Sequence, residues 1–292
     1  MKSQLSFIVY RCGWALIGVL PSRIAYALFA RIADIAYKQN GKGVQRLRAN
    51  YRVVKPALSE DDLEALVRRG MRSYMRYWCD TFRIHRWSSQ EISNTVTTNR
   101  DEYLRSPMRE GKGVVIAIPH SGNWDHAGAY FCQEGFPLVT VAEVLKPERL
   151  FHKFVEHRTR MGFEVLPLEN RTFISLMRKA RDKRLIALVA DRDLSDSGVE
   201  VDFFGKRAKM PAGPALLAIK EGIPLAAAVV RYTSHGIHID FFEVEVSQLD
   251  FESDRVKATV QNMANAFAQG IAEQPEDWHM LQKIWIDSKV YA

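Results

Sequence analysis

Short runs of β-branched and other apolar residues recur from residue 113 onward, with helix-like polar stretches between them. The runs at 114–118 and 185–190 are uninterrupted, which is typical of strands buried on both faces of a parallel sheet. Further strands are predicted at 138–141, 163–166, 199–204, 225–231 and 237–246, and helices at 123–134, 147–160, 172–182, 213–220 and 254–272. This alternation predicts an α/β fold with a central, mostly parallel sheet flanked by helices.

The first 112 residues have a helical pattern instead. Apolar residues recur at helical spacing over 63–78, behind Ser59 and a group of acidic residues that mark a helix start. The apolar stretches 12–20 and 24–37 are too short, or too interrupted by charges, for the roughly 20 residues of a membrane span. They predict amphipathic helices, which can pack on the domain or lie in a membrane interface, and their aromatic residues slightly favour the interface. We expect a single domain over 1–292, in which helices and a polar basic connector (1–56) precede the core (57–292).

The charge of the chain is concentrated in this helical part. The protein has 41 Lys and Arg against 34 Asp and Glu, a net charge of +7. Residues 1–112 hold 20 basic and 10 acidic side chains, whereas the remaining 21 basic and 24 acidic ones give 113–292 a charge of −3. A basic segment can meet nucleic acid, an anionic membrane or an anionic substrate. Since nucleic-acid-binding motifs are missing and the basic residues flank apolar helices, we expect an anionic membrane surface as partner, and no nucleic acid.

The segment that carries candidate chemistry is Ile-Pro-His-Ser-Gly-Asn-Trp-Asp at 118–125. It places His120 just beyond the end of a buried strand, where open α/β sheets bind their ligands. Ser121 or Asn123 can cap the following helix, and Asp125 falls in its first turn. A step of five residues can return the carboxylate of Asp125 to the imidazole of His120. A histidine with a carboxylate partner is a general-base arrangement, although capping and helix-dipole roles would use the same residues.

This segment resembles the first signature block of the glycerolipid acyltransferases, and its longer form resembles the lipid A biosynthesis late acyltransferases. The resemblance extends over most of the chain. Within that branch, the blocks 189–194 and 197–201 are most similar to actinobacterial phosphatidylinositol mannoside acyltransferases. Other matching blocks are 50–52, 191–193, 201–205 and 274–280.

The resemblance implies a reaction and a set of site residues. A fatty acyl group, expected to be palmitoyl, would pass from acyl-CoA to a mannose hydroxyl of a phosphatidylinositol mannoside. His120 would be the general base and Asp125 would orient it. Glu200 is the first choice for a further catalytic acid, with Asp191 and Asp193 as competitors. Substrate-binding roles are expected for Glu143, Arg158, Asp191, Arg192 and Asp193.

Other expectations concern cofactors, location and alternative functions. Cys12, Cys79 and Cys132 are widely spaced, so we expect neither a disulfide framework nor a metal site, and no cofactor other than the acyl-CoA co-substrate. The protein is expected at the cytoplasmic face of the inner membrane as a peripheral or monotopic enzyme. The alternatives are a lipid A-type enzyme with an acyl-carrier-protein donor, a basic nucleic-acid- or membrane-binding protein, and an inactive membrane-anchored scaffold.

Overall fold

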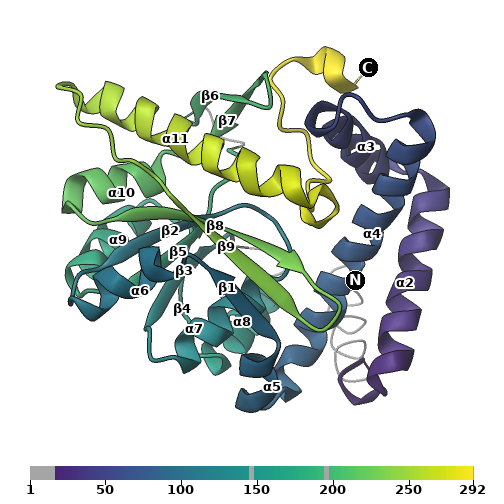
Figure 1. The fold of residues 1–292 in the computed structure, drawn as a ribbon. Coiled ribbons are helices and arrows are strands. Elements are labelled where there is room, and N and C mark those ends of the chain that lie inside the picture. The colour runs from purple at the N-terminus through teal and green to yellow at the C-terminus, as the bar shows by residue number, and fades with distance from the viewer. Residues whose placement is uncertain (1–16, 145–147, 194–196, 292) are drawn as a thin grey trace.

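A seven-stranded sheet forms the centre of the computed structural model, which describes residues 17–144, 148–193 and 197–291 (Figure 1). The strands are β1 (Val96–Asn99), β2 (Val114–Ile118), β3 (Leu138–Ala142), β4 (Glu164–Pro167), β5 (Leu185–Val189), β8 (Leu225–Tyr232) and β9 (Ile237–Glu243). Their order is β1-β9-β8-β2-β5-β3-β4. Every pairing is parallel except that between β8 and β9, so the predicted mostly parallel α/β fold is confirmed.

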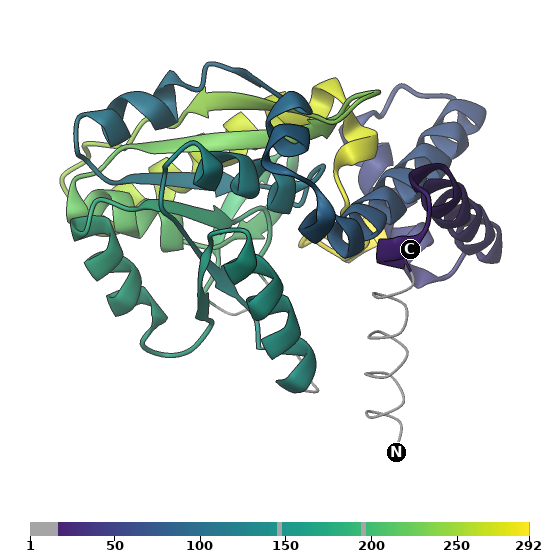
Figure 2. The ribbon, with the colours of Figure 1, turned by 90° about the horizontal axis from the view of Figure 1, so that it is seen from below.

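Helices cover both faces of this sheet (Figures 1 and 2). The helices are α5 (Ser89–Asn94), α6 (Glu102–Arg109), α7 (Trp124–Gln133), α8 (Glu148–Arg160), α9 (Thr172–Arg181), α10 (Gly213–Glu221) and α11 (Glu252–Glu273). In β2, Val115 and Ala117 belong to one core cluster, which includes residues of α10 and α11. Ile116 and Ile118 belong to another, which includes residues of α7. The uninterrupted apolar run of β2 is therefore explained by burial on both faces.

Two segments differ from the predicted pattern. Residues 199–203 form β6 (Val199–Phe203), which pairs with β7 (Lys206–Met210) in a separate antiparallel hairpin and not in the central sheet. The predicted connector at 38–56 is mostly helix α3 (Lys42–Val54). The buried side chains Val44, Leu47, Tyr51 and Val54 recur three or four residues apart, which gives this basic segment an apolar face.

A helical layer packs beside the sheet (Figure 2). Helix α2 (Ser22–Gln39) packs along α4 (Glu60–Arg83), and Ala25, Phe29 and Ala33 face inward. Ser59 caps α4 by accepting a hydrogen bond from the amide of Asp62, as its sequence predicted. None of the described helices is long and apolar enough to cross a membrane.

Candidate active site

The loop between β2 and α7 is held tightly by its neighbours. Gly122 adopts a positive φ of 54°, and a Cβ there would lie 2.5 Å from the carbonyl oxygen of Val230, so the position requires glycine. The buried Ser121 hydroxyl accepts a hydrogen bond from the amide of Val230. Asn123 caps α7, because its Oδ1 accepts from the amide of His126 at 2.9 Å. These contacts fix the backbone that directly follows His120.

The carboxylate partner of His120 is Asp191. The imidazole Nδ1 lies 2.6 Å from Asp191 Oδ1, and the backbone amide of His120 donates to Asp191 Oδ2 at 3.0 Å. The indole Nε1 of Trp278 donates to the same Oδ2 at 2.9 Å. The pairing follows from the sheet, since β2 and β5 are parallel neighbours and Ile118 lies opposite Val189. Both side chains therefore follow the carboxyl ends of adjacent strands.

The ionisation of Asp191 decides where the protons of this pair can lie. Burial raises the pKa of Asp191, but the imidazole of His120 and the hydrogen bonds to the carboxylate outweigh it, and the net pKa lies below its usual value. An ionised Asp191 only accepts hydrogen bonds, so a neutral imidazole at His120 would carry its proton on Nδ1 and its lone pair on Nε2. Asp191 is fully buried, whereas the His120 side chain is 31% exposed, so the imidazole is accessible to a substrate.

Asp125 does not have the partner that the sequence suggested. Its Oδ1 accepts from Nε of Arg158 at 2.8 Å, and its Oδ2 accepts from the Tyr77 hydroxyl at 3.2 Å. The expected placement of its carboxylate against the His120 imidazole is wrong, because the first turn of α7 directs Asp125 toward α8. Trp124 lies between His120 and Asp125 in the sequence, and its ring contacts the His120 imidazole edge to face with centroids 5.7 Å apart.

The other predicted site residues differ in how close they lie to His120 and Asp125. Arg158 lies beside Asp125 as described, while Glu143 is exposed just after β3. Asp193 follows Asp191 and donates its backbone amide to the carbonyl oxygen of Lys209, and Arg192 between them is half-buried. Glu200 is exposed on β6, where it pairs with Arg207 at 3.1 Å. No hydrogen bond or ion pair between described residues joins Glu200 or Arg192 to His120.

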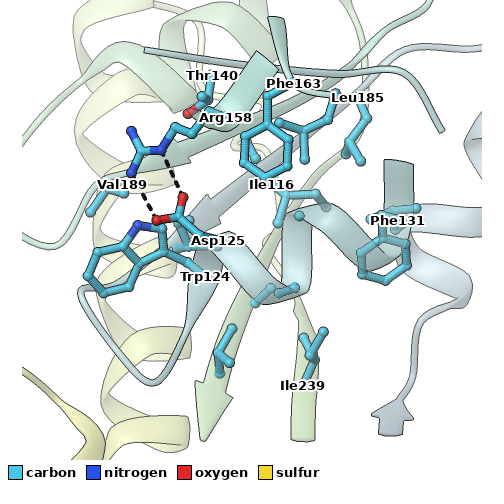
Figure 3. Close-up of a pocket in the computed structure, with 18 of the residues that line it drawn as sticks. Ile116, Trp124, Asp125, Phe131, Thr140, Arg158, Phe163, Leu185, Val189 and Ile239 are labelled. Atoms are coloured by element: carbon cyan, nitrogen blue, oxygen red, sulfur yellow. Dashed lines mark hydrogen bonds and ion pairs between the residues drawn. The ribbon is translucent and has the colours of Figure 1, made fainter. Parts of the chain in front are cut away.

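An apolar pocket extends from this region between α7 and the sheet (Figure 3). The ion pair of Asp125 and Arg158 and the ring of Trp124 lie at one end of it, and Phe131 lies at the other. The strands contribute apolar side chains to its wall, including Ile116, Leu185, Ala187, Val189, Ala228 and Ile239. The pocket therefore joins a polar end, formed by Asp125, Arg158 and Trp124, to an apolar interior.

The described residues offer no site for a metal. They contain no group of three or more His, Cys, Asp or Glu side chains placed to hold an ion. Of the cysteines, Cys79 is buried, Cys132 is partly buried and both are free thiols, while Cys12 lies outside the described residues.

Comparison with known proteins finds relatives of this chain over nearly its whole length. A profile of the family "Bacterial lipid A biosynthesis acyltransferase" matches residues 2–286. The chain belongs to this family. It is 40% identical over 289 residues to a phosphatidylinositol mannoside acyltransferase of Mycolicibacterium smegmatis, covering 98% of this chain and 93% of the relative. A phosphatidylinositol mannoside acyltransferase of Mycobacterium tuberculosis (strain H37Rv) is 38% identical over 290 residues, covering 95% and 87%. Membership of the family makes the protein an acyltransferase, and the resemblance inferred from sequence is confirmed.

Two features of the site were not singled out from the sequence. Trp278 was noted only as part of a matching block, and its indole bond to Asp191 was not anticipated. Asp191 was considered as an acid, but not as the partner of Nδ1. One signal was available for it, since Asp191 follows the strand at 185–189 in the way that His120 follows the strand at 114–118.

Proposed function

We propose that the protein transfers a fatty acyl group, palmitoyl in our hypothesis, from acyl-CoA to a mannose hydroxyl of a phosphatidylinositol mannoside. The observation that carries this proposal is the contact of 2.6 Å between His120 Nδ1 and Asp191 Oδ1, together with an apolar pocket that is lined by Trp124, whose ring touches His120. The acceptor is inferred from relatives that are phosphatidylinositol mannoside acyltransferases. No cofactor or metal is required in this scheme.

In the proposed reaction, Nε2 of His120 takes the proton of the mannose hydroxyl as its oxygen attacks the thioester carbonyl carbon. The new C–O bond forms, the C–S bond breaks, and the imidazolium returns its proton to the departing CoA thiolate. Asp191 holds the Nδ1 proton in place and stabilises the transient imidazolium. The acyl chain would occupy the apolar pocket, and the thioester would lie near Trp124 at its polar end.

We assign Asp125 and Arg158 a structural part in this scheme. Their ion pair is largely buried, with side-chain exposures of 3% for Asp125 and 17% for Arg158, and it links the first turn of α7 to α8. It forms the polar end of the pocket, between the proposed acyl chain and the proposed sugar site. Glu143, exposed at the end of β3, stays a candidate for contact with the sugar. Arg192 and Asp193 stay hypotheses for substrate contact, and Glu200 stays a hypothesis for a further catalytic acid.

We propose that the enzyme works at the cytoplasmic face of an anionic membrane, held in part by α2. Ile24, Leu28, Ile32 and Ile35 recur at i, i+4, i+8 and i+11 on its outer side and are 39–55% exposed. Arg31 and Lys38 are exposed on the same helix. An apolar stripe with basic residues beside it suits the interface of a bilayer that contains anionic lipid. The lipid acceptor resides in such a surface, and nucleic acid is not expected as a partner.

The decisive experiment measures turnover by the purified full-length protein. Palmitoyl-CoA with phosphatidylinositol mannosides is compared with acyl-carrier-protein-bound acyl donor and a lipid A precursor. We expect turnover with the first pair, and a loss of about 10²–10⁴-fold in His120→Ala. His235→Ala, which changes an exposed histidine in the β8–β9 turn, is the control and should retain activity. Turnover only with the second pair would reassign donor and acceptor, and full activity of His120→Ala would exclude the proposed base.

A further inference from the structure

A buried carboxyl group, that of Asp80, contacts the loop that carries His120 through Asn123. Asp80, on α4, is 2% exposed and accepts from three side chains of different elements. Its Oδ1 accepts from the Tyr26 hydroxyl of α2 at 2.6 Å. Its Oδ2 accepts from the Tyr232 hydroxyl of β8 at 3.1 Å and from Nδ2 of Asn123 at 3.4 Å.

Asp80 contacts the loop through the side chain of Asn123. Asn123 uses its other side-chain atom, Oδ1, to cap α7 three residues after His120. Tyr232 belongs to the strand whose Val230 amide binds the Ser121 hydroxyl. Asp80 therefore contacts the residue that ends the loop, and also the strand against which the loop rests. Burial raises the pKa of Asp80, and the hydrogen bonds donated by Tyr26, Tyr232 and Asn123 favour the charged form and limit this rise. The geometry of three donors converging on one buried carboxyl group makes Asp80 an anchor for the elements that carry them.

Asp80 also binds helix α2, through the hydroxyl of Tyr26. Tyr26 is half-buried, and burial, followed by the charge of Asp80, raises the pKa of its hydroxyl. The hydroxyl therefore stays protonated and donates. Ile24 and Leu28, two residues before and after Tyr26, belong to the exposed apolar stripe of α2. One helix thus carries both the proposed membrane face and a hydrogen bond to the anchor of the catalytic loop.

We infer that Asp80 is a positioning residue, which sets the conformation of the His120 loop through Asn123 and couples it to α2 through Tyr26. This inference rests on the proposed function for its effect on turnover, but the contacts themselves predict an effect on the loop. A displacement of a catalytic group by about 1 Å can cost up to 10²-fold in rate. Loss of the Tyr26 hydroxyl should therefore lower kcat and leave the KM for both substrates nearly unchanged.

The helix pair offers a matched control for this test. Tyr37 of α2 donates to Glu64 of α4 at 2.7 Å, so it also joins the two helices through a tyrosine and a carboxylate. Glu64 binds Arg48 of α3 and makes no described hydrogen bond to the loop. Tyr37→Phe and Tyr26→Phe remove the same kind of bond between the same helices. Only Tyr26→Phe removes a hydrogen bond to the carboxyl group that also binds Asn123.

The experiment measures kinetics and amide hydrogen exchange in the full-length Tyr26→Phe and Tyr37→Phe variants. We expect Tyr26→Phe to lower kcat about three- to tenfold, the effect of one hydrogen bond, and Tyr37→Phe to leave kcat unchanged. The amide of His126, whose acceptor is Asn123, should exchange faster only in Tyr26→Phe. In an Asp80→Asn background, Tyr26→Phe should lower kcat little further, because the two substitutions disrupt the same hydrogen-bond network.

Two results would overturn the inference. One is equal kcat and equal exchange at 121–127 in the two tyrosine variants. The other is full additivity of Tyr26→Phe with Asp80→Asn. If the wild-type protein turns over no acyl donor, the proposed function fails, and the exchange measurement still decides whether Asp80 positions the loop.

Discussion

His120 and Asp191 are joined by a bond of 2.6 Å, although 71 positions separate them in the chain. Each follows the end of one of two adjacent parallel strands, so the sheet itself brings them together. Trp278 holds the second oxygen of Asp191, which leaves the carboxylate little freedom to rotate. The pair is preorganised before any substrate binds, and such preorganisation is a major source of catalytic rate.

Replacing Asp191 should affect chemistry more than substrate binding. Asp191→Asn keeps the size of the side chain but removes the charge that stabilises an imidazolium, so we expect kcat to fall about 10²–10⁴-fold. Steady-state kinetics would measure this loss. Glu200→Gln, at an exposed hairpin position, is the comparison and should keep most of the activity. The reverse ranking of the two variants would restore Glu200 as the acid of the site.

Breaking the ion pair of Asp125 and Arg158 should destabilise the fold. Asp125→Ala leaves the Arg158 guanidinium largely buried without its counter-charge, and such losses cost about 3–5 kcal/mol. Urea unfolding of Asp125→Ala, Arg158→Ala and the double variant would measure it. We expect the double variant to lose clearly less free energy of unfolding than the two single variants lose together. Simple additivity would show that the two side chains do not act as a pair.

The apolar pocket should determine which acyl chains are accepted. Ala187 lines it from the middle of β5, and Ala187→Leu would place three more carbon atoms in the pocket. We expect slower turnover of palmitoyl-CoA and a smaller effect on a short-chain acyl-CoA, measured as the ratio of the two kcat/KM values. An unchanged ratio would place the acyl chain elsewhere.

Charges on the outer side of α2 should weaken membrane binding. Leu28→Glu with Ile32→Glu puts two carboxylates into the exposed stripe, which opposes both apolar burial and attraction to anionic lipid. Sedimentation with vesicles that contain anionic phospholipid should show reduced binding. Leu249→Glu, at a leucine that is 53% exposed in the loop before α11, is the control and should bind as the wild type does. Equal binding by all three proteins would exclude α2 as the contact.

Mild acid should destabilise the protein through its buried histidines. Burial lowers the pKa of His126 and His157 to about 4 and that of His279 to about 3, from 6.5. Below pH 6.5 the unfolded chain binds protons that the folded chain does not. The contribution of these histidines to the free energy of unfolding is therefore fully present above pH 6.5. It declines as the pH falls toward 4, by at most about 1.4 kcal/mol per pH unit for each group.

Asp277 opposes this trend, because burial raises its pKa to about 6 and the folded state then binds a proton first. We expect the three histidines to prevail, so that the urea midpoint decreases from pH 7 to pH 5. His126→Gln removes one titrating group and should flatten this dependence. A midpoint that rises toward pH 5, or an equal slope in the variant, would contradict the prediction.

Several features could be predicted from sequence because their causes are local. The apolar run of β2 and the cap and first turn of α7 placed His120 beyond the end of a buried strand. The Ser59 cap likewise marked the start of α4. Short elements such as β1, α5, α6 and β7 were missed, because their few residues give little periodicity to read. The apolar face of α3 was concealed by the basic residues around it.

Contacts between distant segments could not be predicted in the same way. By itself, the sequence determined the strands and helices of the core, the candidate base and the family. Only the tertiary structure decided that β5 lies beside β2, that Asp191 rather than Asp125 meets the imidazole, and that β6 and β7 leave the central sheet. Side-chain periodicity reports which face of an element is buried, whereas the partner across that face is set by packing over the whole chain.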